Sequence, residues 1–193
     1  MSSTDEAATN APDPDQPWTL IIGGDRPAGG AGTYDVINPA TEAVVGRAPE
    51  ATTDQAADAA AAAAEAFESW GLPRPTNFAY PYGDVSARCK TVLAPSFDTM
   101  RGLHHGIVSR RSDRHQLPAV GLEGADALTV GRMWIDRLVD RGGWLILYTH
   151  DVDRNPSPWG CDPDVFEELI DHTIARGAEI MTVRSVVDLL QIG

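Results

Sequence analysis

Two prolines and a glycine fall within residues 71–75, and they set the strongest limit on how this chain folds. Proline lacks a backbone N–H and clashes with the preceding turn, so no helix runs through this segment. Charge also changes here: residues 1–71 carry 12 acidic and two basic side chains, a net charge of −10, whereas residues 72–193 carry −3. The chain is therefore predicted to consist of a disordered tail at 1–17, a first segment at 18–71 and a second segment at 72–193.

Overall charge and composition exclude several classes of protein. The 193 residues have a net charge of −13 and a pI near 4.6, which argues against nucleic acid or an anionic membrane as the main partner. No apolar run approaches the roughly 20 residues of a membrane-spanning helix, and the tail lacks the basic and apolar regions of a secretion signal. Cys89 and Cys161 are too few for a disulfide framework. We expect a protein of a reducing compartment, the cytoplasm.

The first segment is predicted to contain two strands and one helix. Strand-forming residues occur at 18–22 and 43–46, separated by turn residues. A helix is expected to begin at Thr52, because its hydroxyl can accept from the Gln55 N–H while the Gln55 side chain reaches back to the cap. The alanine-rich run then continues to Trp70, and its alternative interpretation is low-complexity sequence.

Part of this segment carries a resemblance. The string Asp35-Val36-Ile37-Asn38-Pro39-Ala40-Thr41 and the alanine-rich helix ending Phe67-Glu68-Ser69-Trp70 resemble the N-terminus of an NAD(P)-dependent aldehyde dehydrogenase. The resemblance implies the opening of a nucleotide-binding domain, whose catalytic cysteine, glutamate base and glycine-rich motif lie downstream in that family and match nothing here. The glycines at 29–32 precede a strand-like segment rather than a helix, so no phosphate loop is predicted.

The second segment has an α/β pattern. Apolar strand candidates lie at 78–80, 144–148 and 179–183, and helix candidates at 85–93, 126–142, 162–177 and 185–190. Residues 96–117 have no clear period and are interpreted as an irregular connection. Two helical stripes are expected to be buried: Val130, Trp134, Ile135, Leu138 and Val139, and then Phe166, Leu169, Ile170, Thr173 and Ile174. Strand, helix and strand follow one another as in a βαβ unit, so loops at the carboxyl ends of strands are where a site is expected.

A second resemblance lies in those loops. Phe78-Ala79-Tyr80-Pro81-Tyr82-Gly83, Thr99-Met100-Arg101-Gly102 and the stretch from Ile146 to Gly160 look like the C-terminal part of a polysaccharide deacetylase, the NodB-like fold of carbohydrate esterase family 4. The resemblance implies an α/β fold: a partial, distorted (β/α) barrel, preceded by a strand-turn-strand and alanine-rich helix from another fold. In complete members a divalent metal, usually zinc, activates the water that hydrolyses an N-acetyl amide.

The same resemblance implies roles for individual residues. His150 matches the general acid that protonates the leaving amine, and the backbone N–H of Tyr82 matches an oxyanion donor. We expect Tyr80, Leu147, Arg101 and Trp159 to contact substrate. Alternatives remain for these groups: His150 as a structural histidine, and Arg101, Arg110, Arg111 and Arg114 as an exposed charged loop rather than an anion site. His104 and His105 could join His150 in holding a metal, or be solvated.

Several family residues are missing. The chain has no Thr-Phe-Asp-Asp string and no His-x-x-x-His pair, and Ala79 and Tyr148 replace an expected arginine and leucine. We therefore expect no metal to bind, with zinc or another divalent ion required only in complete members.

The resulting hypothesis is a chimeric, truncated chain joined between Trp70 and Asn77. It predicts a weakly active or inactive polysaccharide-deacetylase-like hydrolase, with an amino-sugar polymer or a small amide as ligand and with self-association through unpaired strand edges. The alternatives are a non-catalytic interaction fragment, and an aldehyde-dehydrogenase-like fragment of an NAD(P)-dependent oxidoreductase that pairs with an intact subunit.

Overall fold

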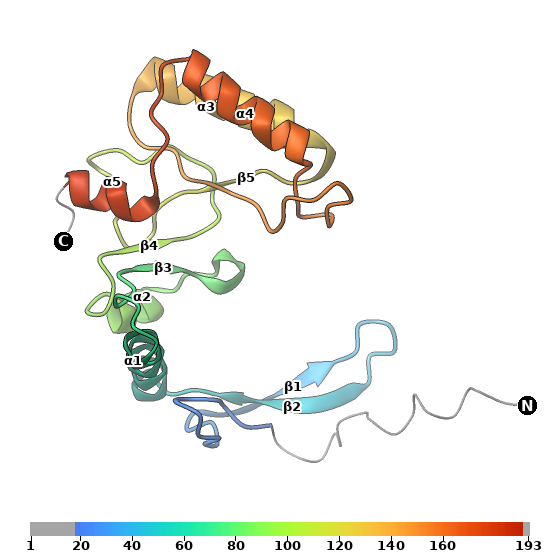
Figure 1. The fold of residues 1–193 in the computed structure, drawn as a ribbon. Coiled ribbons are helices and arrows are strands. Elements are labelled where there is room, and N and C mark those ends of the chain that lie inside the picture. Colours follow the sequence, from blue (N-terminus) through green and yellow to red (C-terminus); the bar gives the residue numbers. More distant parts are fainter. Residues whose placement is uncertain (1–17, 191–193) are drawn as a thin grey trace, which may run out of the picture. The chain divides into compact units, whose positions relative to one another are not determined.

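The computed structural model describes residues 18–190, so the predicted tail at 1–17 lies outside the described residues. The chain divides into two compact units, separated between Arg74 and Pro75. We call them the N-terminal unit and the C-terminal unit. The fold is mixed α/β with three two-stranded sheets, and these residues form no closed barrel (Figure 1). No helix between residues 18 and 190 combines the length and the apolar character needed to cross a membrane.

The N-terminal unit consists of a hairpin and a helix. Strand β1 (Gly32–Ile37) pairs antiparallel with β2 (Val44–Glu50), with a shift in register between Val36 and Ile37, and helix α1 (Thr53–Ser69) follows. The strand predicted at 18–22 is wrong: only an isolated bridge between Ile22 and Asp25 forms there. Strand-forming side chains are present, but outside that bridge residues 18–22 donate, among the described residues, only from Trp18 N–H to Arg47 O and from Leu20 N–H to Pro27 O, which is too few bonds for a ladder.

Helix α1 begins as predicted, with Thr52 as its N-cap. The Thr52 Oγ1 accepts from the Gln55 N–H at 3.1 Å, and Gln55 Oε1 accepts from the Thr52 N–H at 3.0 Å, which completes a capping box. Gln55 also reaches outside the helix, because its Oε1 accepts from Gly30 N–H and its Nε2 donates to Ala28 O. One glutamine therefore fixes both the helix start and the loop that leads into β1.

The C-terminal unit is built from parallel strand pairs and helices. Its elements are β3 (Asn77–Ala79), a 3₁₀ turn (Pro81–Gly83), α2 (Ala87–Leu93), β4 (Thr99–Arg101), β5 (Val120–Gly121), a second 3₁₀ turn (Gly124–Asp126), α3 (Ala127–Arg141), β6 (Leu147–Tyr148), α4 (Pro163–Ala175) and α5 (Val183–Leu190). Strand β3 pairs with β4 in parallel, and β5 pairs with β6 in parallel. Both pairs enclose a helix in sequence, so βαβ units occur here, but not the one expected from residues 144–183, whose last strand does not form.

Two predictions fail in this unit. Residues 96–117 are not wholly irregular, since they contain β4, whose Met100 exchanges backbone hydrogen bonds with Arg114 and Leu117. The strand predicted at 179–183 does not form, and Val183 instead begins α5. Strand β4 has only three residues, which is too short for the alternation of apolar and polar side chains to be recognised in the sequence. Residues 179–183 are mostly apolar, but they have no neighbouring strand to pair with in the described structure.

Burial differs sharply between the units. Among residues 18–190, Ala64 is the only buried apolar side chain that belongs to the N-terminal unit. The C-terminal unit holds all the others, and some of them form two clusters: one around Ile135, Cys161 and Leu169, and one around Leu117 and Ala119. Burial of apolar area is the main favourable term in folding, so the C-terminal unit is the better stabilised by its own core.

Helices α3 and α4 lie side by side in the C-terminal unit (Figure 1). Ile135 and Leu169 are buried as expected, but Val139, Phe166 and Ile174 are exposed, because each helix buries a narrower stripe than its apolar residues suggest. At Gly131 an added Cβ would lie 2.6 Å from Leu169 Cδ2, so the glycine permits the close approach.

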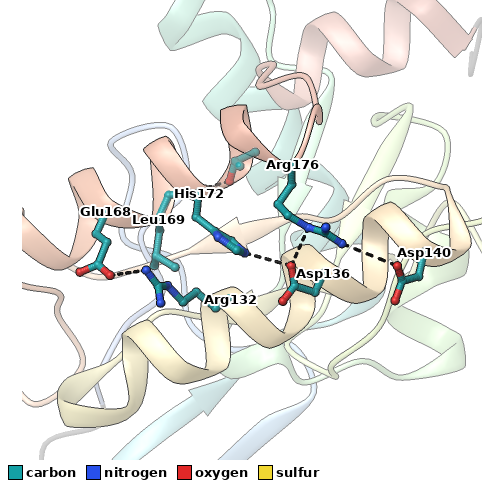
Figure 2. A network of polar contacts seen from close by, with 8 residues as sticks. Arg132, Asp136, Asp140, Glu168, Leu169, His172 and Arg176 are labelled. Carbon is teal, nitrogen blue, oxygen red and sulfur yellow. Dashed lines mark hydrogen bonds and ion pairs between the residues drawn. The ribbon is translucent and has the colours of Figure 1, made fainter.

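Ion pairs border this helix contact (Figure 2). The carboxylate of Asp136 accepts from Arg176 Nε at 2.9 Å and lies 3.0 Å from His172 Nε2, while Arg132 pairs with Glu168. These side chains are partly exposed, so each pair contributes only about 0–1 kcal/mol. The packing of Gly131 against Leu169 is the more specific determinant of the helix contact.

Replacing Gly131 with valine is expected to destabilise the C-terminal unit. Valine has the better helix propensity, but its side chain would overlap Leu169, and such overpacking costs about 1–3 kcal/mol. Urea unfolding followed by circular dichroism measures the effect, with Thr129→Val on the exposed side of the same helix as the control. Equal unfolding midpoints for the two variants would contradict this account of the helix contact.

Candidate functional site

Side chains from three parallel strands meet at their carboxyl ends in the C-terminal unit. Arg101 ends β4, Tyr148 ends β6 and Glu123 follows β5 by two residues. The Arg101 Cζ lies 5.0 Å from the centre of the Tyr148 ring, which is a cation–π arrangement. Burial, together with the charge and hydrogen bond of Glu123, raises the pKa of Tyr148. We call Arg101, Tyr148 and Glu123 the strand-end cluster.

Tyr80 follows β3 and has a structural environment. Its side chain is buried, and its hydroxyl donates to the His115 carbonyl oxygen at 3.0 Å and lies 3.4 Å from Met100 Sδ. Burial, followed by the nearby Cys89 and Asp113, raises the pKa of Tyr80 to about 12. The Tyr80 phenol is thus neutral at pH 7, and its hydroxyl is already hydrogen-bonded to the His115 carbonyl oxygen. Substrate contact by Tyr80, like that expected for Leu147, which packs against the core, stays a prediction.

Tyr82 lies at a strained turn and points into solvent. It has a φ of 54° and a ψ of 12°, in the left-handed region that non-glycine residues rarely adopt, and its exposed fraction is 98%. Strained backbone of this kind costs about 1–3 kcal/mol and persists only where its surroundings impose it. The strain marks this turn as a tightly specified feature, while the oxyanion role expected for the Tyr82 N–H remains a prediction.

His150 and Trp159 lie near the two ends of the loop that follows β6. The His150 N–H donates to the Trp159 carbonyl oxygen at 3.2 Å, and both side chains are exposed. Asp151 organises the loop, because its carboxylate accepts from both the N–H and the hydroxyl of Ser157. A Cβ on Gly160 would overlap Asp151 Oδ1, so this loop requires glycine there. The backbone of His150 is therefore fixed by its hydrogen bond to Trp159, while its side chain is exposed. The general-acid role of His150 remains a prediction.

The residues do not fit a divalent metal. Between residues 18 and 190, no group of three or more His, Cys, Asp and Glu side chains is arranged to hold an ion. His104 and His105 line a separate open cavity with Asp113, of about 370 Å³. Three protein ligands and an open position are what a catalytic zinc site needs. No metal-dependent step is derived for this chain.

The two cysteines are poor nucleophiles. Cys161 is fully buried and Cys89 is partly buried. Burial raises the pKa of both thiols, with Asp162 as a further cause at Cys161. Because the thiolate is the reactive form, a raised pKa lowers the reactive fraction at neutral pH. Neither cysteine has the setting of a catalytic thiol.

Thiol alkylation tests this assignment. At pH 7 we expect iodoacetamide to modify the native chain at least several-fold more slowly than the urea-unfolded chain, with Cys161 slower than Cys89, because both thiols are protonated and shielded. The rates are measured by mass spectrometry of the two cysteine peptides. A native Cys161 that reacts as fast as in urea would refute the assignment.

Sequence reasoning missed Tyr148 and Glu123 as members of a cluster. Arg101 was noticed for its charge, but its neighbours come from positions 123 and 148, which no local motif connects. Only Tyr148 ends a strand predicted from sequence, because residues 96–117 are interpreted from sequence as an irregular connection and no strand is predicted at 120–121. Arg110, Arg111 and Arg114 belong to the exposed connection instead.

The N-terminal unit offers a surface rather than a cavity. Tyr34 and Ile37 on β1 have exposed fractions of 59% and 57%, and Trp70 after α1 has 68%. Because successive side chains alternate along a strand, Tyr34 and Ile37 lie on opposite faces of the hairpin. The outer edge of β2 accepts the Trp18 N–H at Arg47 O, but within residues 18–190 no backbone group bonds to the outer edge of β1. We call β1, with its exposed side chains Tyr34 and Ile37, the hairpin surface.

Comparison with known proteins relates only this first part of the chain to a family. Residues 27–77 match the model of the aldehyde dehydrogenase family. The match covers a minority of the chain and includes β1, β2 and α1. No curated protein and no solved structure matches the sequence. The aldehyde-dehydrogenase-like character of the first segment is thus supported, and the deacetylase resemblance has no support from these comparisons.

Proposed function

We propose that this chain functions as a binding protein whose aldehyde-dehydrogenase-like segment docks onto a subunit of an aldehyde dehydrogenase. The observation that carries the proposal is the hairpin surface, which lies within the matched residues 27–77. A hairpin with apolar side chains exposed on both faces is marginally stable in water. Tyr34 and Ile37 offer a partner apolar area on each face of the hairpin.

The partner class follows from the family match. In this proposal the complementary surface is the part of a dehydrogenase domain against which its own equivalent segment would pack. The free edge of β1 adds backbone donors and acceptors that a partner strand can satisfy. Side chains on the two faces then contribute apolar area, which is the larger part of the association energy.

The chemistry of the chain favours docking over dehydrogenase catalysis. Both thiols are protonated at neutral pH, as their raised pKa values indicate. The loop at residues 29–32 leads into β1 rather than into a helix N-terminus, so it lacks the geometry that binds a dinucleotide pyrophosphate. In this proposal the partner subunit supplies cofactor binding and turnover.

The binding test uses the full chain and an aldehyde dehydrogenase subunit prepared without the segment equivalent to residues 27–77. We expect the two to co-elute in size-exclusion chromatography at a fixed ratio, because the shortened subunit exposes the complementary surface. The intact subunit is the control and is expected to bind at least tenfold more weakly, since its own segment occupies that surface. A chain that only self-associates, or stays alone, would overturn the proposal.

Charge substitution identifies the surface used. We expect Tyr34→Lys combined with Ile37→Lys to weaken binding at least tenfold, which corresponds to about 1.4 kcal/mol. The matched control is Ile174→Lys with Ile180→Lys in the C-terminal unit, where exposed fractions are 62% and 56%. Circular dichroism verifies that both variants fold. Equal loss of binding in both pairs would show that added charge, not the hairpin surface, is responsible.

A second candidate function is weak amide hydrolysis at the strand ends of the C-terminal unit. It is favoured by the placement of the strand-end cluster and the His150 loop after parallel strands, where α/β proteins bind ligands. In this candidate water attacks the amide carbonyl carbon, the C–N bond breaks to leave the carboxylic acid, and His150 supplies a proton to the departing amine without a metal.

Acetate release from an N-acetylated chitooligosaccharide tests the second candidate. The candidate predicts slow release without added metal, abolished in His150→Ala and kept in the control His104→Ala, because only His150 follows β6. Acetate is quantified by an enzyme-coupled assay. Release no faster than in buffer, or unchanged in His150→Ala, would eliminate hydrolysis by this group.

A further inference from the structure

A cavity of about 170 Å³ opens beside the strands of the C-terminal unit. Its large apolar lining residues come from β3, the segment before β5, the residue before β6 and the start of α5: Phe78, Leu117, Ile146 and Val183. One charged side chain, Arg101, also lines it. At about 30 Å³ for each water-sized group, the cavity accommodates roughly five or six non-hydrogen atoms. Its size and lining fit a small molecule with a short hydrocarbon part.

Arg101 brings a positive charge to this cavity without a carboxylate partner. It is partly buried, and none of the ion pairs among residues 18–190 includes it. Burial lowers the pKa of Arg101, as expected for a guanidinium removed from water and not compensated by an acid. The nearest acidic group of the strand-end cluster, Glu123, is engaged by the Tyr148 hydroxyl. The guanidinium therefore keeps donors that no protein acid uses.

Contacts around Arg101 hold the side chain in place. The Tyr148 ring covers it at 5.0 Å, which restricts the orientation of the planar guanidinium. The other polar groups of the lining satisfy each other, because Thr99 Oγ1 donates to Asn77 Oδ1 at 2.6 Å. One cationic residue of restricted orientation thus lines a mostly apolar cavity.

We propose that this cavity binds a small monocarboxylate with a short alkyl chain, whose carboxylate pairs with Arg101 and whose alkyl part contacts Phe78, Leu117 and Ile146. A guanidinium presents paired N–H donors that match the two oxygens of a carboxylate. The apolar lining disfavours strongly hydrated anions such as phosphate, and the volume excludes long chains. This site lies within the C-terminal unit and is independent of the docking function proposed above.

The test titrates the full chain with n-butyrate by isothermal calorimetry, with n-butyramide as the uncharged control of equal size. We expect saturable butyrate binding, and butyramide and octanoate each at least tenfold weaker. Arg101→Gln is expected to weaken butyrate binding at least tenfold, whereas Arg110→Gln, in the exposed connection, leaves it unchanged.

A second variant keeps the test valid if Arg101→Gln fails to fold. Ala79 lines the cavity and is exposed, so Ala79→Leu fills the space without removing the charge or disturbing the core. We expect this variant to bind butyrate at least tenfold more weakly while its thermal unfolding is unchanged. Butyramide binding as tightly as butyrate, or undiminished butyrate binding in Ala79→Leu, would overturn the proposal.

Discussion

Unequal burial is the constraint on which the rest of this structure depends. The C-terminal unit covers Met100, Leu117, Ile135 and Cys161 almost completely, while the N-terminal unit buries a single alanine side chain among its described residues. A folded chain gains most of its stability from buried apolar area. The N-terminal unit is consequently held by its local contacts, with Gln55 as their centre, and its apolar side chains stay available to a partner.

Strand β4 has the corresponding central place in the C-terminal unit. It pairs with β3 on one side and bonds to Arg114 and Leu117 on the other, so Thr99 and Met100 are enclosed. Arg101 is the next residue of the strand and is only partly buried; its guanidinium lies over the Tyr148 ring, and the residue also lines the cavity. The same short strand therefore determines both the core and the charged group beside it.

Sequence alone predicted the features that depend on local chemistry. The Thr52 capping box, the alanine-rich helix, and helices α3 and α4 follow from side chains within a few positions of one another. Features that depend on distant pairing were not predictable in the same way. Residues 179–183 have strand-forming side chains but no partner, whereas β4 is a strand because its partners enclose it.

The candidate sites also combine features that local sequence predicts with features that depend on distant contacts. Arg101 could be selected from sequence for its charge and for the family-like string at residues 99–102, but its lack of an acidic partner depends on where Glu123 and Tyr148 fold. The exposure of Tyr34 and Ile37 could not be read from their apolar character, which by itself predicts burial. Family resemblance identified the N-terminal segment, and the structure then supplied its uncovered surface.

Hydrogen exchange at the backbone amides of Thr33–Ile37 tests the central claim, docking through the hairpin surface, most directly. The full chain is compared with and without an excess of the dehydrogenase subunit that lacks the equivalent segment. Alternate amides of β1 point to its free edge, where a partner strand would engage them, so the account predicts slower exchange within residues 33–37 and unchanged exchange in α3 and α4. Identical exchange at residues 33–37 in both samples would contradict it.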